Sequence, residues 1–156
     1  MPATDAIEIL VADALAAGLS AAEYAGDYES VDARRVYVPD YQAADIADLH
    51  VSVVPGSCEI SGATHGADMY EFEIHVLVAK RLALDSEIDG LVELRTQLAN
   101  LIRSNKVPAA DPPMPAGTKW VSVNNETTFD RDALTGNRIF LADMVVTYRR
   151  LQAKAV

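Results

Sequence analysis

The sequence predicts an α+β fold: a single antiparallel, twisted sheet with two main helices packed on one face. Three observations carry this prediction. One long segment alternates apolar and polar side chains, two segments repeat apolar side chains at helical spacing, and the predicted elements follow the order α-β-β-β-α-β-β. Because 50% of its 156 residues are hydrophobic and 23% are charged, the stretch 1–156 is expected to form one domain with a substantial core.

The first predicted element is a helix over residues 5–17. Apolar residues recur there at helical spacing, and Gly18 follows as a residue suited to end a helix. Two short strands are then expected at residues 34–38 and 49–54, because each is rich in β-branched or aromatic residues and stops at a proline. The acidic stretch 40–48 between them is interpreted as a turn of helix or an ordered crossover.

The clearest strand signal follows a predicted flexible loop. The loop, residues 55–68, contains three glycines and many small polar residues. The strand, residues 69–82, places Glu71, Glu73 and His75 between apolar neighbours, and this period of two predicts one buried and one wet face. It is about twice as long as a usual strand of about five or six residues, so it is expected to reach a partner or to line a surface.

The second predicted helix carries its apolar face over residues 88–102 and is expected to end near residues 104–106. A wide leucine-rich face marks it, Ser86 is a suitable N-cap, and Asp89 lies three residues further on in a near capping box. The stretch 107–117 contains four prolines, which exclude a helix or a central strand and predict a stiff, extended connection.

Two more strands complete the predicted sheet. Residues 119–123 form a short one and residues 138–151 a strand as long as the third, with a turn-rich loop at 124–137 between them. Because the two longest strands are similar in length, they are expected to pair.

The charge of the chain bears on its partners. The formal net charge is −10, from 23 acidic and 13 basic residues, and this balance argues against wrapping nucleic acid. The acidity keeps the protein soluble, or belongs to a surface that repels DNA, or has no electrostatic role. Cys58, as a single cysteine, favours a reducing compartment, and the N-terminus lacks the basic region of a signal peptide. No apolar stretch approaches the roughly 20 residues needed to span a membrane.

The sequence offers no motif for catalysis, so the chain is predicted not to be an enzyme and to need no cofactor. Glycine-rich phosphate loops, nucleophile elbows and dinucleotide fingerprints are absent from the sequence. His75 shares a strand face with Glu71 and Glu73, and three such side chains are able to hold a cation, but a solvated polar face is the commoner outcome and no metal is predicted. Cys58 has no sequence neighbour that would activate its thiol.

The order of the elements, with a few anchors, resembles a known family. The anchors are the strand ends at 36–39 (VYVP) and 53–55 (VVP), the alternating strand at 70–78, the helix at 88–102 and the final Tyr-Arg-Arg at 148–150. Over most of its length the chain resembles the tail terminator, or tail-completion, proteins of long-tailed bacteriophages. The resemblance implies a hexameric ring that caps the finished tail tube, stops its polymerisation and joins the neck of the filled head. It also implies a virion protein, assembled in the host cytoplasm, through whose lumen DNA passes without specific binding.

This resemblance suggests roles for particular residues, each with a plainer alternative. The polar face of the long strand is a candidate lining of the channel, or simply faces bulk water: Glu71, Glu73 and His75. The basic end of the last strand is a candidate contact between subunits, or merely aids solubility: Tyr148, Arg149 and Arg150. The loops 55–68 and 124–137 are candidate contact arms or ordinary surface loops, and the long strands are candidates for pairing with a neighbour.

Other functions remain open at the level of sequence. One is a different neck or head-completion protein, or a minor capsid component. Another is a small cytoplasmic enzyme or ligand-binding α+β domain, whose pocket would be lined by aromatic side chains. The candidates for such a lining are Tyr24, Tyr28, Tyr37, Tyr41 and Trp120.

Overall fold

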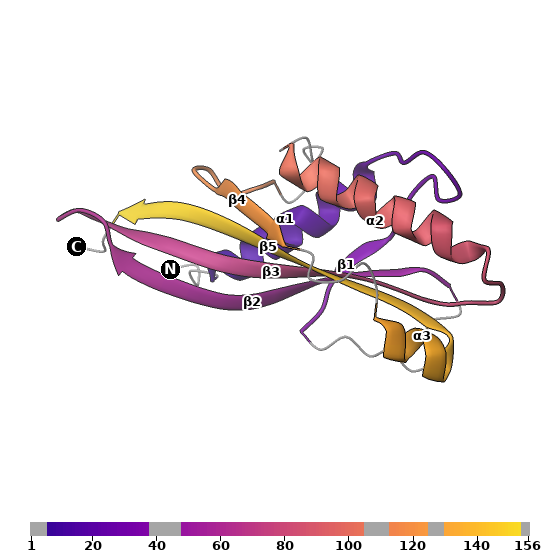
Figure 1. Ribbon diagram of the computed structural model, residues 1–156. Coiled ribbons are helices and arrows are strands. Elements are labelled where there is room, and N and C mark those ends of the chain that lie inside the picture. Colours follow the sequence, from indigo (N-terminus) through magenta and orange to yellow (C-terminus); the bar gives the residue numbers. More distant parts are fainter. Residues whose placement is uncertain (1–5, 38–47, 105–112, 125–129, 154–156) are drawn as a thin grey trace.

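The computed structural model describes residues 6–37, 48–104, 113–124 and 130–153, and its α+β architecture confirms the predicted fold class (Figure 1). One sheet of five strands, in the order β1-β2-β3-β5-β4, carries the helices α1 and α2 on one face. The elements are α1 Ile7–Ala21, β1 Ala33–Arg35, β2 His50–Gly62, β3 Ala67–Arg81, α2 Glu87–Arg103, β4 Lys119–Asn124, α3 Arg131–Asn137 and β5 Ile139–Ala153.

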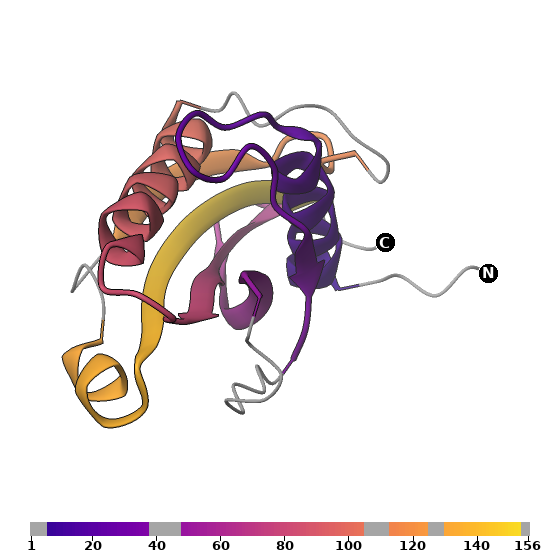
Figure 2. The same cartoon turned by 90° about the vertical axis from the view of Figure 1, so that its right-hand side faces the viewer.

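The sheet is antiparallel except at one margin. The central strands β3 and β5 pair over their full 15 residues, from Ala67 opposite Ala153 to Arg81 opposite Ile139, as their similar lengths predict. The strand β2 flanks β3 and β4 flanks β5, both antiparallel, whereas the short β1 runs parallel to β2. Figure 2 shows the strong twist of the sheet beneath α1 and α2.

The hydrophobic core lies between the sheet and the two long helices. Alternate residues of β3 from Phe72 to Val78 point into it, as the period of two predicts, and β5 contributes a matching series. Helix α1 covers the β1–β2 side of the sheet and α2 covers the β4–β5 side. The largest fully buried side chains are Phe72, Phe140, Leu15, Leu19, Ile74, Leu91, Leu94, Leu98, Ile102, Met144 and Val11.

The first helix is longer than the sequence predicts. It continues through Gly18, which is buried, and ends at Ala21, so the prediction that Gly18 ends the helix is wrong. Leu19 is fully buried in the core, and its burial favours another helical turn over the intrinsic preference of glycine.

The segment after α1 folds back onto α2, where one side chain holds it. The amide of Gln97 accepts a hydrogen bond from the backbone N–H of Ala25 at 2.8 Å and donates one to the carbonyl of Ala25 at 2.7 Å. This pair of bonds satisfies both backbone groups of a residue outside any helix or strand.

Replacing Gln97 with alanine is expected to lower the free energy of unfolding by about 1–2 kcal/mol, because two net hydrogen bonds are lost. Urea unfolding followed by circular dichroism measures this change. Thr96→Ala, at the exposed neighbouring position of α2, is the matched control and is expected to have a much smaller effect. Equal effects at the two positions would show that Gln97 does not hold the segment.

Helix α2 begins as predicted but is capped differently. Ser86 has helical backbone angles and makes no side-chain cap hydrogen bond, so the predicted capping box is wrong. Instead the carboxylate of Glu87 accepts hydrogen bonds from the backbone N–H groups of Ala83 and Leu84, at 2.7 and 2.9 Å. The Nζ atom of Lys80 donates to the same carboxylate at 2.6 Å. The hydrogen bond from Lys80, followed by those from Leu84 and Ala83, lowers the pKa of Glu87 to about 2.

The lowered pKa of Glu87 predicts a pH dependence of stability. Because the usual pKa is 4.5, the contribution of the ionised carboxylate is complete above about pH 4.5 and is lost as the pH falls toward 2. Glu87→Gln is therefore expected to lose less of its urea midpoint between pH 6 and pH 3 than the wild type does. Parallel losses in the two proteins would contradict this assignment.

The prediction of a loop at 55–68 is wrong, because β2 continues to Gly62 and only residues 63–66 connect it to β3. The carbonyl of Val53 accepts a hydrogen bond from the N–H of Val36, so the backbone groups of Val53 point toward β1. Residues two apart in a strand direct their backbone groups to the same side, so the nitrogen of Pro55 also points away from β3. Proline therefore removes no hydrogen bond between β2 and β3. A bulge between Pro55 and Cys58 follows, where a Cβ on Gly56 would lie 2.9 Å from the carbonyl oxygen of Glu73.

The predicted loop at 124–137 also contains unpredicted structure. Its second half forms the short helix α3, which lies on the other side of the sheet from α2 (Figure 1). The carboxylate of Asp130 accepts a hydrogen bond from the N–H of Asp132 at 2.9 Å and so caps the helix. Of the predicted stretch 107–117, residues 113–117 contain no helix or strand, and the rest lies outside the described residues, as does nearly all of 40–48.

Candidate functional site

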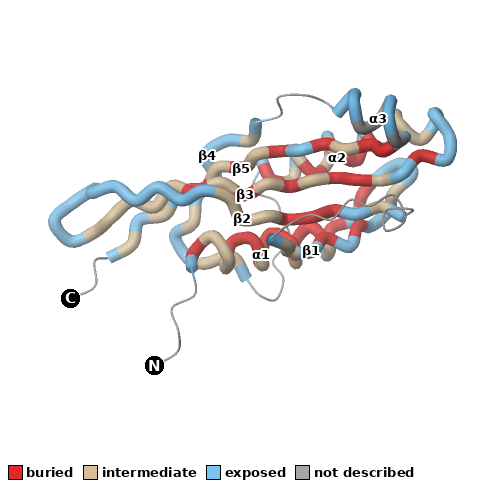
Figure 3. Tube along the Cα trace, turned by 90° about the horizontal axis from the view of Figure 1, so that it is seen from below, coloured by how far each residue is buried: buried red, intermediate tan, exposed pale blue. Residues whose placement is uncertain are grey.

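Part of the sheet extends beyond the helices as a ribbon that is exposed to solvent. We call residues 57–72 and 148–153 the arm; it comprises the ends of β2 and β3, their connection and the end of β5. Every residue from 57 to 66 is exposed, and Figure 3 shows the arm projecting from the body. An isolated hairpin is marginal in water, so the third strand from β5 is what makes such a projection stable.

Two aromatic rings anchor the arm to the body. The rings of Phe72 and Tyr148 stack with their centroids 6.0 Å apart and their planes at 22°. Both side chains are almost fully buried, and Phe72 and Tyr148 lie directly opposite each other on β3 and β5. The core thus reaches the root of the arm and stops there.

The outer margins of the sheet are largely unpaired among the described residues. The strand β1 pairs with β2 only from Val51 to Val53, which leaves the outer edge of β2 open from residue 54 to 62. At the other side, β4 is the last strand of the sheet, and residues 150–153 of β5 extend past it. Free strand edges are potential sites for pairing with another chain.

Four charged residues form a line across the face of the sheet that α1 and α2 leave open. Glu59 lies opposite Glu71, Glu71 opposite Arg149, and Arg149 opposite Lys119, so the line crosses β2, β3, β5 and β4 in turn. We call these four residues the charge row. Cross-strand partners point to the same face of a sheet, so the row reads acid, acid, base, base from one margin to the other.

Only the middle of the charge row is paired. The Nη2 atom of Arg149 lies 3.1 Å from the Oε2 atom of Glu71. The outer members, Glu59 and Lys119, form no ion pair with the described residues, and each lies beside a residue of its own sign. Like charges directly opposite each other destabilise a sheet, so each margin of the isolated chain carries a small electrostatic penalty.

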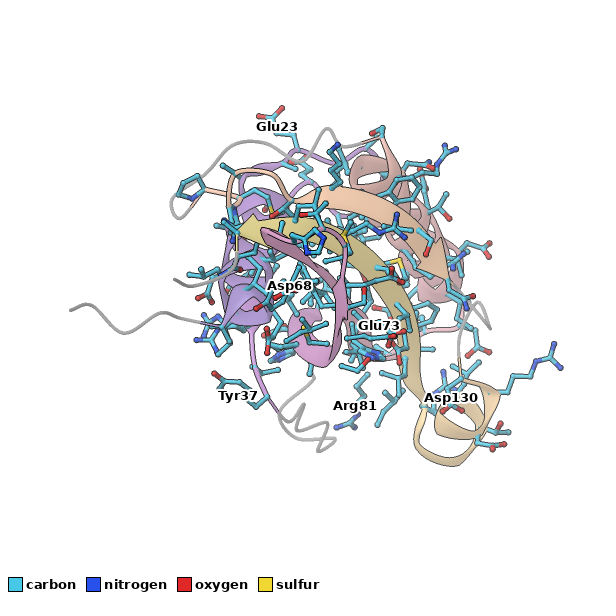
Figure 4. All side chains as sticks on the ribbon, turned by 90° about the vertical axis from the view of Figure 1, so that its left-hand side faces the viewer. Glu23, Tyr37, Asp68, Glu73, Arg81 and Asp130 are labelled. Carbon is cyan, nitrogen blue, oxygen red and sulfur yellow. The ribbon has the colours of Figure 1, made fainter. Side chains whose placement is uncertain are left out.

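The remaining predicted channel residues lie on the same open face. His75 contacts Asp143 of β5, with 3.2 Å between Nδ1 and Oδ1, and the Oε2 atom of Glu73 accepts a hydrogen bond from Ser57 at 3.3 Å. Figure 4 looks along the arm and shows Glu73 on the side of the sheet away from α2. The structure therefore brings Glu71, Glu73 and His75 to one surface, but it gives each a partner.

The three predicted contact residues at the end of β5 do not share a surface. Arg149 belongs to the open face, whereas Tyr148 is buried against Phe72, so its ring is part of the core of this chain and is not available to a neighbour. Burial also raises the pKa of the Tyr148 hydroxyl. Arg150 lies opposite Tyr70 on the helix side, and its Nε atom is buried without a hydrogen bond.

A shallow groove of about 250 Å³ lies between α2 and the segment after α1. Of the aromatic residues that the sequence offers for a pocket, Tyr24 lines it; its hydroxyl donates a hydrogen bond to the carbonyl of Leu19, and burial raises its pKa. Tyr28 and Trp120 pack against the core instead, Tyr37 is exposed beneath the guanidinium of Arg35, and residue 41 lies outside the described part of the chain. The groove is lined by Glu23, Tyr24, Gln97, Asn100, Leu101 and Ser104.

The groove and the rest of the described chain contain little that favours a reaction. Glu23 is the one carboxylate among the residues that line the groove, and no histidine, lysine or cysteine lines it. Burial, with a smaller effect of Glu8, raises the pKa of the Cys58 thiol, which disfavours the reactive thiolate. Within the described ranges no three histidine, cysteine or carboxylate side chains are grouped to hold a metal ion. None of the helices described is both long and apolar enough to cross a membrane.

No protein-family model matches the sequence, and no curated protein matches it either.

Sequence reasoning does not find Glu59 and Lys119, the two ends of the charge row. Each is an ordinary surface residue in the sequence, and Glu59 falls in the stretch predicted to be a loop. Only the register of four strands brings them into line. The alternation of Glu59 and Ser61 with Cys58 and Ile60 is the one available signal of a strand in that stretch.

Proposed function

We propose that this protein is a tail terminator of a long-tailed bacteriophage, a structural component of the virion and not an enzyme. Copies of the chain form a ring, expected to be a hexamer, that caps the completed tail tube and joins it to the neck protein. DNA passes through the ring without specific binding. Two observations support this function. The order of the elements in the sequence resembles that family, and the arm, the most prominent surface feature of the fold, is suited to assembly.

The arm is the observation that carries the proposal. It is a three-stranded ribbon with exposed side chains and open edges, anchored to a compact body by Phe72 and Tyr148. Proteins usually shorten or cover exposed strands because these invite pairing with other chains. A long ribbon that remains uncovered is therefore expected to be used in a contact with another subunit or with the tube.

The open face of the sheet is the candidate lining of the lumen. It carries the acids Glu59, Glu71, Glu73 and Asp143, of which Glu71 is paired with Arg149, so the negative charge available to repel DNA rests on the other three. The formal net charge of −10 supports a surface along which DNA slides without sticking.

Electron microscopy of the purified protein mixed with tail tubes tests this function. The expected result is a ring of density at one end of each tube and the arrest of further tube growth. Density at the head portal, away from tubes, would instead place the protein elsewhere in the neck. Failure to bind tubes, portals or neck proteins would overturn the proposal.

A further inference from the structure

We propose that copies of this chain associate head to tail through opposite margins of the sheet, so that Glu59 of one copy faces Lys119 of the next. This inference deepens the proposed function, because it assigns the contact that would close the ring. It concerns the outer edge of β2 between residues 54 and 62 and the outer edge of β4.

Strand direction permits this contact without changing the pattern of the sheet. The pairs β2–β3, β3–β5 and β5–β4 are all antiparallel, so β2 and β4 run in opposite directions within one copy. A neighbour related by rotation about an axis parallel to the strands keeps these directions. Its β2 therefore lies antiparallel to β4 of the first copy, and the sheet continues from one copy to the next.

The two margins also lie at the same height along the strands. When the register is followed through β5 and β3, Asn124 of β4 is level with Val54 of β2, and Lys119 is level with Glu59. This part of β2 begins directly after the last residue that β1 covers, Val53. Among the described residues, the unpaired length of β2 thus starts level with the outer edge of β4, and the arm extends beyond it.

Charge distinguishes this contact from the alternatives. Inside one copy Glu59 faces Glu71 and Lys119 faces Arg149, both of them like-charge pairs. Head-to-tail contact places an opposite charge beside each outer residue and continues the row as acid, acid, base, base. A two-fold contact between β2 strands would bring Glu59 toward its own copy, and one between β4 strands would do the same for Lys119. Both are repulsive, so the occupant of each margin is the opposite margin of a second copy.

The test reverses the charges singly and together. Glu59→Lys and Lys119→Glu are each expected to weaken self-association by about tenfold, measured by sedimentation velocity and native mass spectrometry, because each turns the attraction between subunits into repulsion. The double variant E59K/K119E exchanges the two margins and is expected to associate within about threefold of the wild type. An equimolar mixture of the two single variants is also expected to associate, since alternating copies then face each other with opposite charges.

The variants contain their own control for folding. Within one chain, Glu59→Lys places a cation beside Glu71, and Lys119→Glu places a carboxylate beside Arg149. Each single reversal thus replaces a like-charge pair with an opposite one, so the melting temperature of the monomer is expected not to fall. Glu23→Lys makes the same charge change at an exposed residue on the helical side, as Figure 4 shows, and is expected to leave association unchanged.

Three results would overturn the inference. They are a wild-type protein that remains monomeric up to about 1 mM, single reversals that associate like the wild type, and a double variant no better than the singles. Tube capping by the wild type is scored separately. If the double variant regains self-association but the protein does not bind tubes, the proposed function alone is rejected. If the protein caps tubes and neither charge reversal changes that capping, this contact alone is rejected.

Discussion

Replacing Phe72 with alanine is expected to lower the free energy of unfolding by about 3–5 kcal/mol, the largest effect of any single substitution we propose. The ring is 1% exposed and stacks on Tyr148 at the root of the arm. Its removal leaves a cavity beside Tyr148, where the hydrophobic core ends and the arm begins. Domains of this size are typically stable by about 5–15 kcal/mol, so the variant is expected to unfold at a much lower urea concentration.

Two matched variants distinguish loss of packing from loss of the arm. Phe72→Leu keeps most of the apolar volume and is expected to lose clearly less stability than Phe72→Ala. Tyr148→Phe keeps the stacked ring and is expected to remain close to the wild type. A Phe72→Ala protein with an unchanged urea midpoint would show that these rings do not anchor the arm.

Shortening the arm is expected to abolish assembly while the body stays folded. The change replaces residues 60–70 by an Asn-Gly turn, so that Glu59 and Glu71 become the last paired residues of the hairpin. The residues removed are exposed or half-buried, and the fully buried core begins only at Phe72. Thermal unfolding is therefore expected to remain cooperative, whereas ring density on tail tubes is expected to disappear in electron micrographs.

The matched control keeps the arm at full length and changes its chemistry. Ile60 is a large apolar side chain of the arm and is 58% exposed, so Ile60→Ser tests whether this side chain or the length of the ribbon is required. Assembly that survives the shortening would contradict a role for the arm. Assembly lost with Ile60→Ser alone would assign the contact to an apolar side chain and not to the strand edge.

The elements with strong periodic patterns could be predicted from the sequence. The alternation from Tyr70 to Val78 gives both the strand and its buried face, since Phe72, Ile74 and Val76 are all in the core. The leucine-rich pattern of α2 identifies a helix whose observed bounds, Glu87–Arg103, begin directly after the predicted N-cap and end just before the predicted end near residues 104–106. In these segments local pattern and tertiary packing agree.

The elements that the sequence does not predict depend on neighbours that a local pattern does not contain. Pro55 and Gly56 are typical loop residues, yet a free outer edge accommodates the proline and a bulge requires the glycine. In α3 the cap from Asp130 is a local signal, but the helix is short and its composition resembles a turn. The parallel pairing of β1 with β2 is accompanied by α1, which packs on both strands and is distant from β2 in the sequence.

The candidate site could be predicted only in part, for a similar reason. The shared face of Glu71, Glu73 and His75 follows from a period of two within one strand. The same rule predicts that Tyr148 is buried, because it lies two residues from the buried Val146 on β5, although the basic residues beside it favour a surface position. The line from Glu59 to Lys119 requires the register of four strands, which no single segment encodes.

The order of charges across the open face has one further consequence. Within the charge row, acids on one flank and bases on the other give a lateral electric moment perpendicular to the strands, although the backbone of an antiparallel sheet contributes almost none. In the proposed head-to-tail contact, this moment would orient two approaching copies before they touch, and contact between two like flanks would be repulsive. A head-to-tail contact joins two different margins, so each copy in it would keep one margin free for a further copy. The proposed contact therefore favours a closed ring of several copies over a two-fold pair.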